Sequence, residues 1–329
     1  MRNKATIILS VVVFLTALFV LSQNRAPDAT VARSDSGVGD KGPRIIPLPG
    51  KVPQKVEPPD RAFRFAPSMP GNRPAIATEV MYSADVRATY DKYNSAEDPT
   101  GEISYFLFKA LDDCTPFAGR TPGQIAQLMN VRQQPIESAS RTRLIRESVE
   151  RCKGFASWDH SALIVQVEDL RQKAARAGYP AAVATTLPRL LWTKGAQYAD
   201  EVAISLLSGD VDGDVVQGIY QYLLARNGNE WFAEQGDPAA SIAAWTLLEC
   251  NMGAECGARG HPVITACLFF GACDQHDVIT VLPIMNPALD PERLQEAIEI
   301  ETNLGNAIRN RDWVRLGFTY PRKRPDPKS

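Results

Sequence analysis

The stretch Ala233–Cys273, AEQGDPAASIAAWTLLECNMGAECGARGHPVITACLFFGAC, contains most of the features that decide the fold. Asp237-Pro238 is typical of a helix start, because an N-cap residue is followed by proline at the first helical position, where its missing N–H does no harm. Apolar residues then recur at helical spacing, separated by alanines that allow close helix packing. After Gly253 the chain turns, and His261-Pro262 begins a second short helix. The pattern predicts a helical hairpin over residues 237–273 that holds four of the six cysteines.

The same signals continue on both sides of this hairpin and predict an all-α domain over residues 75–320. Thr121 and Gln124 form a capping box, and Asp98-Pro99 and Asp290-Pro291 are further helix starts. Only Val278–Leu282 is rich enough in β-branched residues for a strand, and it is isolated. The remaining predicted helices cover residues 75–94, 99–114, 122–129, 136–152, 158–177, 181–191, 196–207 and 213–225.

Residues 1–22 have the composition of a signal anchor or a signal peptide. Arg2 and Lys4 precede an uninterrupted apolar run, Ala5–Leu21, which is long for a signal-peptide core and short for a membrane span. Because flanking positive charges stay in the cytoplasm, we expect the rest of the chain to be exported. The length of the run leaves open whether the segment is retained or removed.

Two locations follow from this segment. If it is retained, residues 5–22 hold the protein in the inner membrane of a bacterial-type envelope, with its body in the periplasm. If it is cleaved near Ser22, the protein is periplasmic or secreted. The formal net charge of −2, without a concentrated basic motif, argues against a nucleic-acid partner. The expected partners are therefore proteins or other components of the cell envelope.

Residues 23–74 differ sharply in composition from the domain that follows. They contain ten prolines mixed with glycine, serine and charged residues. Such a segment cannot bury enough apolar area to offset the entropy of ordering it. We expect a disordered, extended linker, and a proline-rich docking site is the alternative. The tail 321–329, PRKRPDPKS, is basic and is also expected to be frayed.

Two short segments echo each other and suggest an internal repeat. Residues 174–182, AARAGYPAA, and residues 233–240, AEQGDPAA, each place alanines around a glycine just before a helix start. They resemble the opening of a Sel1-like repeat, a relative of the tetratricopeptide repeats, over at most Lys173–Gly271. The resemblance implies an α-solenoid of stacked helical hairpins that binds other proteins and has no catalytic residues. The sequence departs from the family pattern at Pro188, which interrupts the first copy, and it lacks the tyrosine-glycine ending. Secreted Sel1-like proteins with cysteines bridging the two helices of a repeat are the nearer parallel.

Six cysteines in an exported chain predict disulfide bonds. The four cysteines of the hairpin allow three connectivities. Antiparallel helices face each other in nested register, so we favour the nested arrangement, which leaves the two remaining cysteines to pair with each other. The predicted pairs are Cys250–Cys273, Cys256–Cys267 and Cys114–Cys152.

The sequence contains no complete catalytic or metal-binding motif. His261 and His276 could join cysteines around zinc, but the Cys-x5-Cys spacing and the oxidising compartment argue against a zinc site. Adjacent residues cannot converge as a triad does, so Asp159-His160-Ser161 is interpreted as a helix cap. Asp210–Asp214 begins like a calcium loop, but Val215 stands where glycine is needed, and a polar turn is the better interpretation. No catalytic, cofactor-binding or metal-ligating residue is therefore predicted, and no cofactor.

The leading functional prediction is a membrane-tethered or exported helical-repeat scaffold that mediates protein or envelope interactions. One alternative is an exported hydrolase that uses carboxylates such as Glu102, Asp112 or Asp113 in a helical cleft. Another is a small-ligand carrier with a pocket between hairpins. Converging carboxylates with perturbed pKa values in a closed cavity would favour the enzyme, whereas a concave groove would favour the scaffold.

Overall fold

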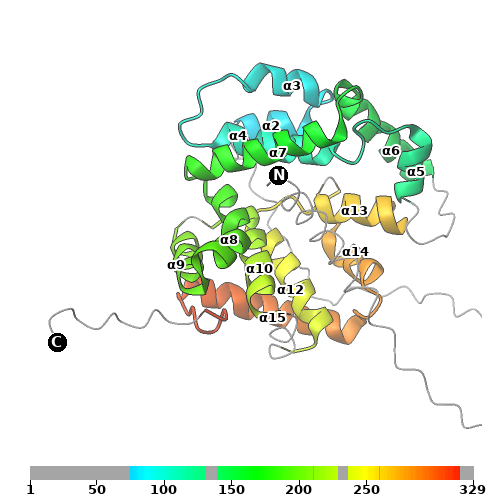
Figure 1. Ribbon diagram of the computed structural model, residues 1–329. Coiled ribbons are helices and arrows are strands. Elements are labelled where there is room, and N and C mark those ends of the chain that lie inside the picture. The colour runs from blue at the N-terminus through cyan, green and yellow to red at the C-terminus, as the bar shows by residue number, and fades with distance from the viewer. Residues whose placement is uncertain (1–74, 130–138, 210, 229–235, 259, 319–329) are drawn as a thin grey trace, which may run out of the picture. The chain divides into compact units, whose positions relative to one another are not determined.

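The computed structural model describes residues 75–129, 139–209, 211–228, 236–258 and 260–318. These described residues form thirteen α-helices and one 3-10 helix, and they contain no strand (Figure 1). The predicted all-α class is therefore confirmed for this part of the chain. The strand-like run Val278–Leu282 lies in a helix, α14 (Val278–Met285), which Asp277 caps by accepting a hydrogen bond from the Thr280 N–H at 2.9 Å.

The predicted signal segment 1–22, linker 23–74 and tail 321–329 lie outside the residues that the structure describes. Among the described helices, none is both long enough and apolar enough to cross a membrane. The anchor therefore stays a prediction from the sequence.

The N-terminal half of the described chain surrounds one apolar core. Its largest fully buried side chains include Leu107, Leu111, Phe155 and Leu163. Helix α4 packs against α7, α2 and α3, so the other elements are arranged around it. The elements of this half are α2 (Ala75–Tyr82), α3 (Val86–Tyr93), α4 (Glu102–Cys114), α5 (Pro122–Met129), α6 (Ala139–Cys152), the 3-10 helix η1 (Lys153–Phe155) and α7 (His160–Arg176).

The C-terminal half builds a second core in which alanines alternate with larger apolar residues. Helix α8 packs against α10, α9 and α7, and helix α12 packs against α15 and α10. Ile219, Tyr222 and Leu223 of α10 are fully buried in this core. Besides α14, the elements are α8 (Pro180–Lys194), α9 (Ala196–Leu207), α10 (Gly213–Asn227), α12 (Pro238–Asn251), α13 (His261–Phe270) and α15 (Pro291–Arg309).

Small residues set how closely the helices of the second core approach. A Cβ atom added to Gly218 of α10 would lie 2.5 Å from the Ala184 Cβ and 2.8 Å from the Ala184 carbonyl carbon of α8. Real Cβ atoms do not come this close, so α8 and α10 can pack at this distance only because glycine faces alanine. Pro188 lies inside α8 and does not break it.

The helix starts follow the capping chemistry expected from the sequence. The Thr121 N–H donates to Gln124 Oε1 at 2.8 Å, and the Gln124 N–H donates to Thr121 Oγ1 at 3.3 Å, which is a complete capping box. Asp237 accepts from the Ala239 N–H at 2.9 Å at the start of α12. Asp98 caps α4 from farther before the helix start than expected. Its carboxylate accepts from the N–H groups of Ile103 and Ser104 at 3.2 Å and 2.8 Å, and α4 begins three residues later than predicted, at Glu102.

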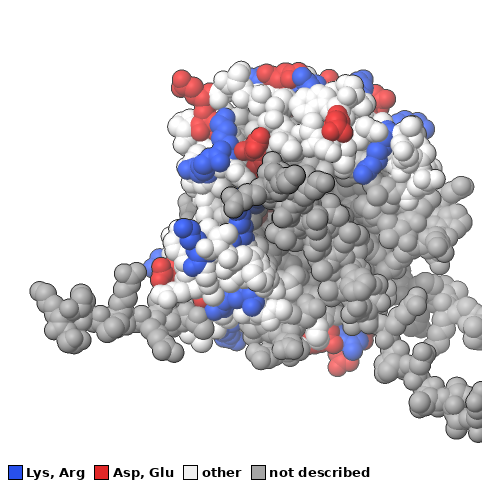
Figure 2. Space-filling model, in the orientation of Figure 1, with Lys and Arg blue, Asp and Glu red and all other residues white. Residues whose placement is uncertain are grey.

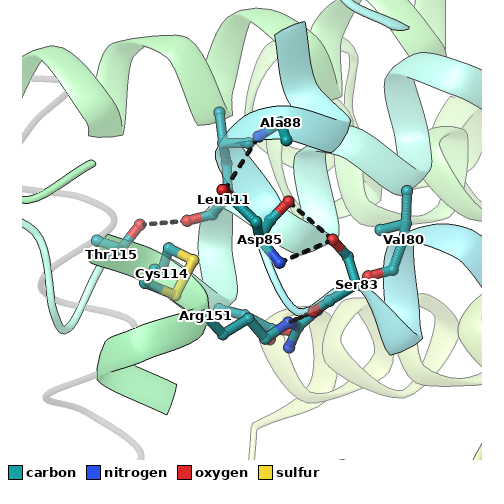
Figure 3. The surroundings of a disulfide bond; sticks show 10 residues. Val80, Ser83, Asp85, Ala88, Leu111, Cys114, Thr115 and Arg151 are labelled. Atoms are coloured by element: carbon teal, nitrogen blue, oxygen red, sulfur yellow. Dashed lines mark hydrogen bonds and ion pairs between the residues drawn. A yellow bond between two sulfur atoms is a disulfide. The ribbon is translucent and has the colours of Figure 1, made fainter. Parts of the chain in front are cut away.

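The disulfide between Cys114 and Cys152 joins the ends of α4 and α6, with Cα atoms 5.3 Å apart (Figure 3). Both residues are buried in the first core. Beside it, Arg151 of α6 donates from Nε to the Ser83 carbonyl at 3.1 Å and from Nη2 to the Val80 carbonyl at 3.0 Å. The bridge and this arginine together fasten α6 to α4 and to the end of α2.

The nested pairing predicted for the other four cysteines is wrong. Cys250 pairs with Cys256, and Cys267 pairs with Cys273, so neither Cys250–Cys273 nor Cys256–Cys267 forms. The physical reason is that α12 and α13 are not partners in a hairpin. Helix α12 packs on α10 and α15, whereas α13 packs on α14 and α6. Each bridge instead closes the turn after its own helix, where Gly253 and Gly271 take φ values of 97° and 74° and reverse the chain.

Candidate functional site

Charged side chains from four helices converge around Lys109. The Lys109 Nζ lies 2.6 Å from Asp214 Oδ1, although the two residues are 105 positions apart in the sequence. Through space Lys109 also interacts electrostatically with Asp113 and Glu249, and His261 interacts with the same lysine. We call this group the Lys109 cluster: Lys109, Asp112 and Asp113 of α4, Asp212 and Asp214 at the start of α10, Glu249 of α12 and His261 of α13.

Local packing explains why these groups meet. Asp112 and Asp113 follow Lys109 by three and four residues, so both lie on the same face of α4 as Lys109. A Cβ atom added to Gly213 would clash with the Glu249 carbonyl oxygen, which shows that the start of α10 abuts the end of α12. This close approach brings Asp214 and Glu249 to the same place. It depends on glycine, because any side chain at position 213 would push the two helices apart.

Glu249 is the most perturbed carboxyl group of the cluster. It is half-buried in α12, and burial raises its pKa to about 8, with a further contribution from Asp214 that the Lys109 ammonium only partly opposes. A carboxyl group with this pKa holds its proton at neutral pH. Glu249 is therefore a neutral acid beside the ion pair of Lys109 and Asp214.

Asp112 differs from Glu249 in being exposed to solvent. Even so, desolvation by the surrounding helices and the neighbouring Asp113 raise its pKa to about 6, against the lowering effects of Lys109 and Arg171. Asp112 is mostly ionised at pH 7 and can accept a proton.

The other members of the cluster follow the same balance of burial and charge. Burial lowers the pKa of Lys109, but the Asp214 carboxylate outweighs it, so the pKa of the ammonium is raised and it stays charged. Desolvation lowers the pKa of His261, which favours neutral imidazole. Desolvation also raises the pKa of Asp212, whose Oδ1 accepts a hydrogen bond from the Val215 N–H at 2.8 Å as the cap of α10.

Of the carboxylates proposed from the sequence, the structure brings Asp112 and Asp113 into the cluster. Asp113 also lies 3.5 Å from Arg151 Nη1 through its Oδ2 atom. Glu102 stands at the opposite end of α4 and acts on Tyr179 instead. Sequence reasoning missed Lys109 and Glu249 and interpreted Asp214 only as part of a polar turn, because nothing in the local pattern of α4, α10 or α12 marks these faces as meeting.

The remaining motifs keep their structural roles. Asp159 precedes α7 as the N-cap residue but makes no side-chain capping hydrogen bond, so that expectation is only half correct. Among the described residues, no three His, Cys, Asp or Glu side chains are arranged to hold a metal ion. His261 belongs to the Lys109 cluster and His276 does not enter it.

The protonation of Glu249 makes stability depend on pH. Its pKa is higher in the folded than in the unfolded protein, so its contribution to folding stability decreases as pH rises from about 4.5 to about 8. Glutamine resembles the protonated acid and removes this penalty. We therefore expect Glu249→Gln to be more stable than wild type at pH 8 by about 2 kcal/mol, after allowing for partial solvation, and to be nearly equal at pH 4.5.

Urea unfolding at several pH values measures this difference. Glu299→Gln, at an exposed position of α15, is the matched control and should follow the wild-type curve. If Glu249→Gln also runs parallel to wild type between pH 5 and 8, then Glu249 is not protonated in the native state.

No protein-family model, curated protein or solved structure matches the chain.

Proposed function

We propose that the Lys109 cluster is the active site of an exported hydrolase that uses general acid–base catalysis. The observation that carries the proposal is a protonated Glu249 beside charged Lys109 and Asp214, with ionised Asp112 nearby. Enzymes create a separate acid and base at neutral pH by placing neighbouring carboxyl groups in environments that make their pKa values differ. The fold supplies this contrast from three different helices.

In the proposed reaction Asp112 accepts a proton from water while the resulting hydroxide bonds to the electrophilic carbon of the substrate. The bond from that carbon to the leaving group breaks, and Glu249 gives its proton to the leaving group. Afterwards Asp112 loses its proton to solvent and Glu249 regains one, which restores the starting state. Lys109 holds Asp214 in place and limits how far the Glu249 pKa rises.

The charge of the cluster restricts the class of substrate. Asp112, Asp113, Asp212 and Asp214 outnumber the three cations near them, Lys109, Arg151 and Arg171, and the His261 imidazole is neutral at pH 7. This small excess of negative charge disfavours phosphate esters and other anions relative to neutral or cationic substrates. Neutral esters, amides and glycosides are therefore the compounds to test.

The test is hydrolysis of a panel of chromogenic esters, amides and glycosides, with a phosphate monoester as the anionic control. We expect turnover of at least one neutral substrate, with a bell-shaped pH profile whose limbs lie near pH 6 and pH 8. Glu249→Gln and Asp112→Asn should each lower kcat by roughly 10²- to 10⁴-fold. Asp91→Asn, an exposed change on α3, should leave kcat unchanged. Turnover of the phosphate ester alone, or full activity in Glu249→Gln, would contradict the proposal.

A second candidate is the membrane-tethered helical-repeat scaffold. Helices that are adjacent in the chain pack on one another, as α7 does on α8 and α8 on α9, which supports a stacked arrangement of helices. In this proposal the chain is held by residues 5–22 and binds protein or envelope partners. Crosslinking of the tethered protein in intact cells tests it. A defined partner recovered from wild type and from Glu249→Gln alike would favour the scaffold over the enzyme.

A further inference from the structure

The connection between α8 and α9 exposes two aromatic side chains. Trp192, in the last turn of α8, has 77% of its surface exposed, more than any other large hydrophobic residue in the described part of the chain. Tyr198, in the first turn of α9, is 47% exposed. Tryptophan is highly buried on average in folded proteins, so this degree of exposure is unusual. We call Arg189, Trp192, Lys194 and Tyr198 the Trp192 corner.

The backbone makes this corner protrude. Helix α8 ends at Lys194 and α9 begins at Ala196, so Gly195 alone connects them, with a φ of 88° that favours glycine. A Cβ atom added to Gly195 would meet nothing within 4 Å. All residues from 192 to 198 are exposed. The two aromatic rings therefore stand on the two arms of a convex turn.

Basic side chains outnumber acidic ones around the corner, where Arg189 and Lys194 are both exposed. Residues 170–199 contain five basic side chains, Arg171, Lys173, Arg176, Arg189 and Lys194, and no acidic one. Asp200 is buried and paired with Arg226, so it does not offset this charge at the surface. Glu201 is exposed, and Glu168 pairs with Arg171 and interacts with Arg189, so these two carboxylates balance part of the charge. The face of α8 and α9 that Figure 2 shows carries mainly Lys and Arg side chains. The corner thus combines amphipathic rings with exposed cations.

We propose that the Trp192 corner docks onto the surface of a bilayer that contains anionic phospholipid. Tryptophan and tyrosine rings settle at the level of the lipid headgroups, and Lys and Arg side chains bind anionic headgroups. A protein partner fits less well, because a stable protein interface buries about 800 Å² on each side. A convex corner with two rings offers much less apolar area, but it suffices for shallow contact with lipid.

The predicted tether would place this surface within reach of a membrane. A 52-residue linker, residues 23–74, has a root-mean-square length of roughly 40 Å or more if it is disordered. A weak contact is then enough to hold the domain at the bilayer. The docking does not depend on the chemistry of the Lys109 cluster, so an inactive site would leave the proposal untouched.

Quenching of tryptophan fluorescence by brominated lipid tests the contact. The full chain is reconstituted in phosphatidylglycerol vesicles with brominated acyl chains, and its emission is compared with that of Trp192→Phe. We expect wild type to lose the share of emission that belongs to Trp192, one of five tryptophans, and Trp192→Phe to show no such loss. Trp313→Phe is the matched aromatic control and should be quenched as wild type is.

Charge reversal separates electrostatic docking from insertion of the N-terminal segment. Arg189→Glu with Lys194→Glu should abolish the quenching of Trp192. Arg143→Glu with Lys153→Glu makes the same change in net charge at exposed positions of α6 and η1, and it should not affect the quenching. Equal quenching of wild type and Trp192→Phe would overturn the proposal, as would equal quenching of Trp192 in zwitterionic vesicles. Crosslinking of position 192 to a protein without lipid quenching would also overturn it, in favour of a protein partner.

Discussion

Replacing Asp200 by alanine is expected to lower the free energy of unfolding by about 3–5 kcal/mol, because it leaves a buried arginine without its counter-ion. Asp200 of α9 lies 2.9 Å from Arg226 Nη2 of α10, and the two side chains are only 4% and 11% exposed. The Tyr222 hydroxyl donates to the same carboxylate at 2.5 Å, and Arg226 Nη1 donates to the Gly317 carbonyl at 2.6 Å. One carboxylate therefore helps to fix α9, α10 and the segment after α15.

Chemical denaturation of a double-mutant cycle measures this contribution. Asp200→Ala, Arg226→Ala and the double variant should be non-additive, with the double variant losing less than the sum of the single losses. Asp91→Ala, which breaks the exposed pair of Asp91 and Arg87, is the control and should change stability by less than about 0.5 kcal/mol. A loss of that small size in Asp200→Ala would mean that water reaches the pair and that the ends of α9 and α10 are loosely packed.

Removing the disulfide between α4 and α6 is expected to have an effect of similar size. The Cys114–Cys152 bridge closes a loop with a sequence separation of 38, for which loop-closure entropy gives about 4 kcal/mol. The bridge from Cys250 to Cys256 spans only six positions, and the same relation gives about 2 kcal/mol. The variant with both Cys114 and Cys152 changed to alanine should therefore unfold at a lower urea concentration than the variant lacking Cys250 and Cys256.

The pairing of the cysteines is tested separately, by proteolytic mapping. Proteolytic mapping of the oxidised wild type should recover the Cys250–Cys256 bridge and the Cys267–Cys273 bridge each within a single peptide. A peptide that links Cys250 to Cys273 would restore the nested hairpin and contradict the fold around α12 and α13. Equal losses of stability in the two double variants would mean that the long bridge does not constrain the unfolded chain as expected.

Most helices could be predicted from the sequence, because their start signals act locally. The bounds of α9 match the predicted segment, and the caps at Thr121, Asp237 and Asp290 form as expected. The single helix predicted over residues 75–94 was one exception among the described residues, since the structure has α2 and α3 there, and the run at Val278 was another. Its β-branched residues favour a strand, but Asp277 caps a helix there and no neighbouring strand exists within the described residues to pair with it.

The arrangement of the helices could not be predicted, because hydrophobic periodicity shows which face of a helix is buried and not what it is buried against. The nested cysteine pairs assumed that consecutive helices face each other, whereas α12 lies on α15. Prediction of the candidate site from the sequence is limited in the same way. Asp112 and Asp113 were candidates on chemical grounds, but Glu249 gained its role only because Gly213 lets α10 approach α12.

The protonation state of Glu249 at neutral pH tests the central claim most directly. Carbon-13 NMR of the side-chain carboxyl groups, followed from pH 3 to pH 10, reports each glutamate separately. The account predicts one glutamate that titrates near pH 8, is absent from Glu249→Gln, and moves to still higher pH in Lys109→Met, since Lys109 lowers its pKa. If Glu249 instead titrates at the ordinary value near 4.3 in both the wild type and Lys109→Met, the Lys109 cluster has no neutral acid and the proposed hydrolase has no proton donor.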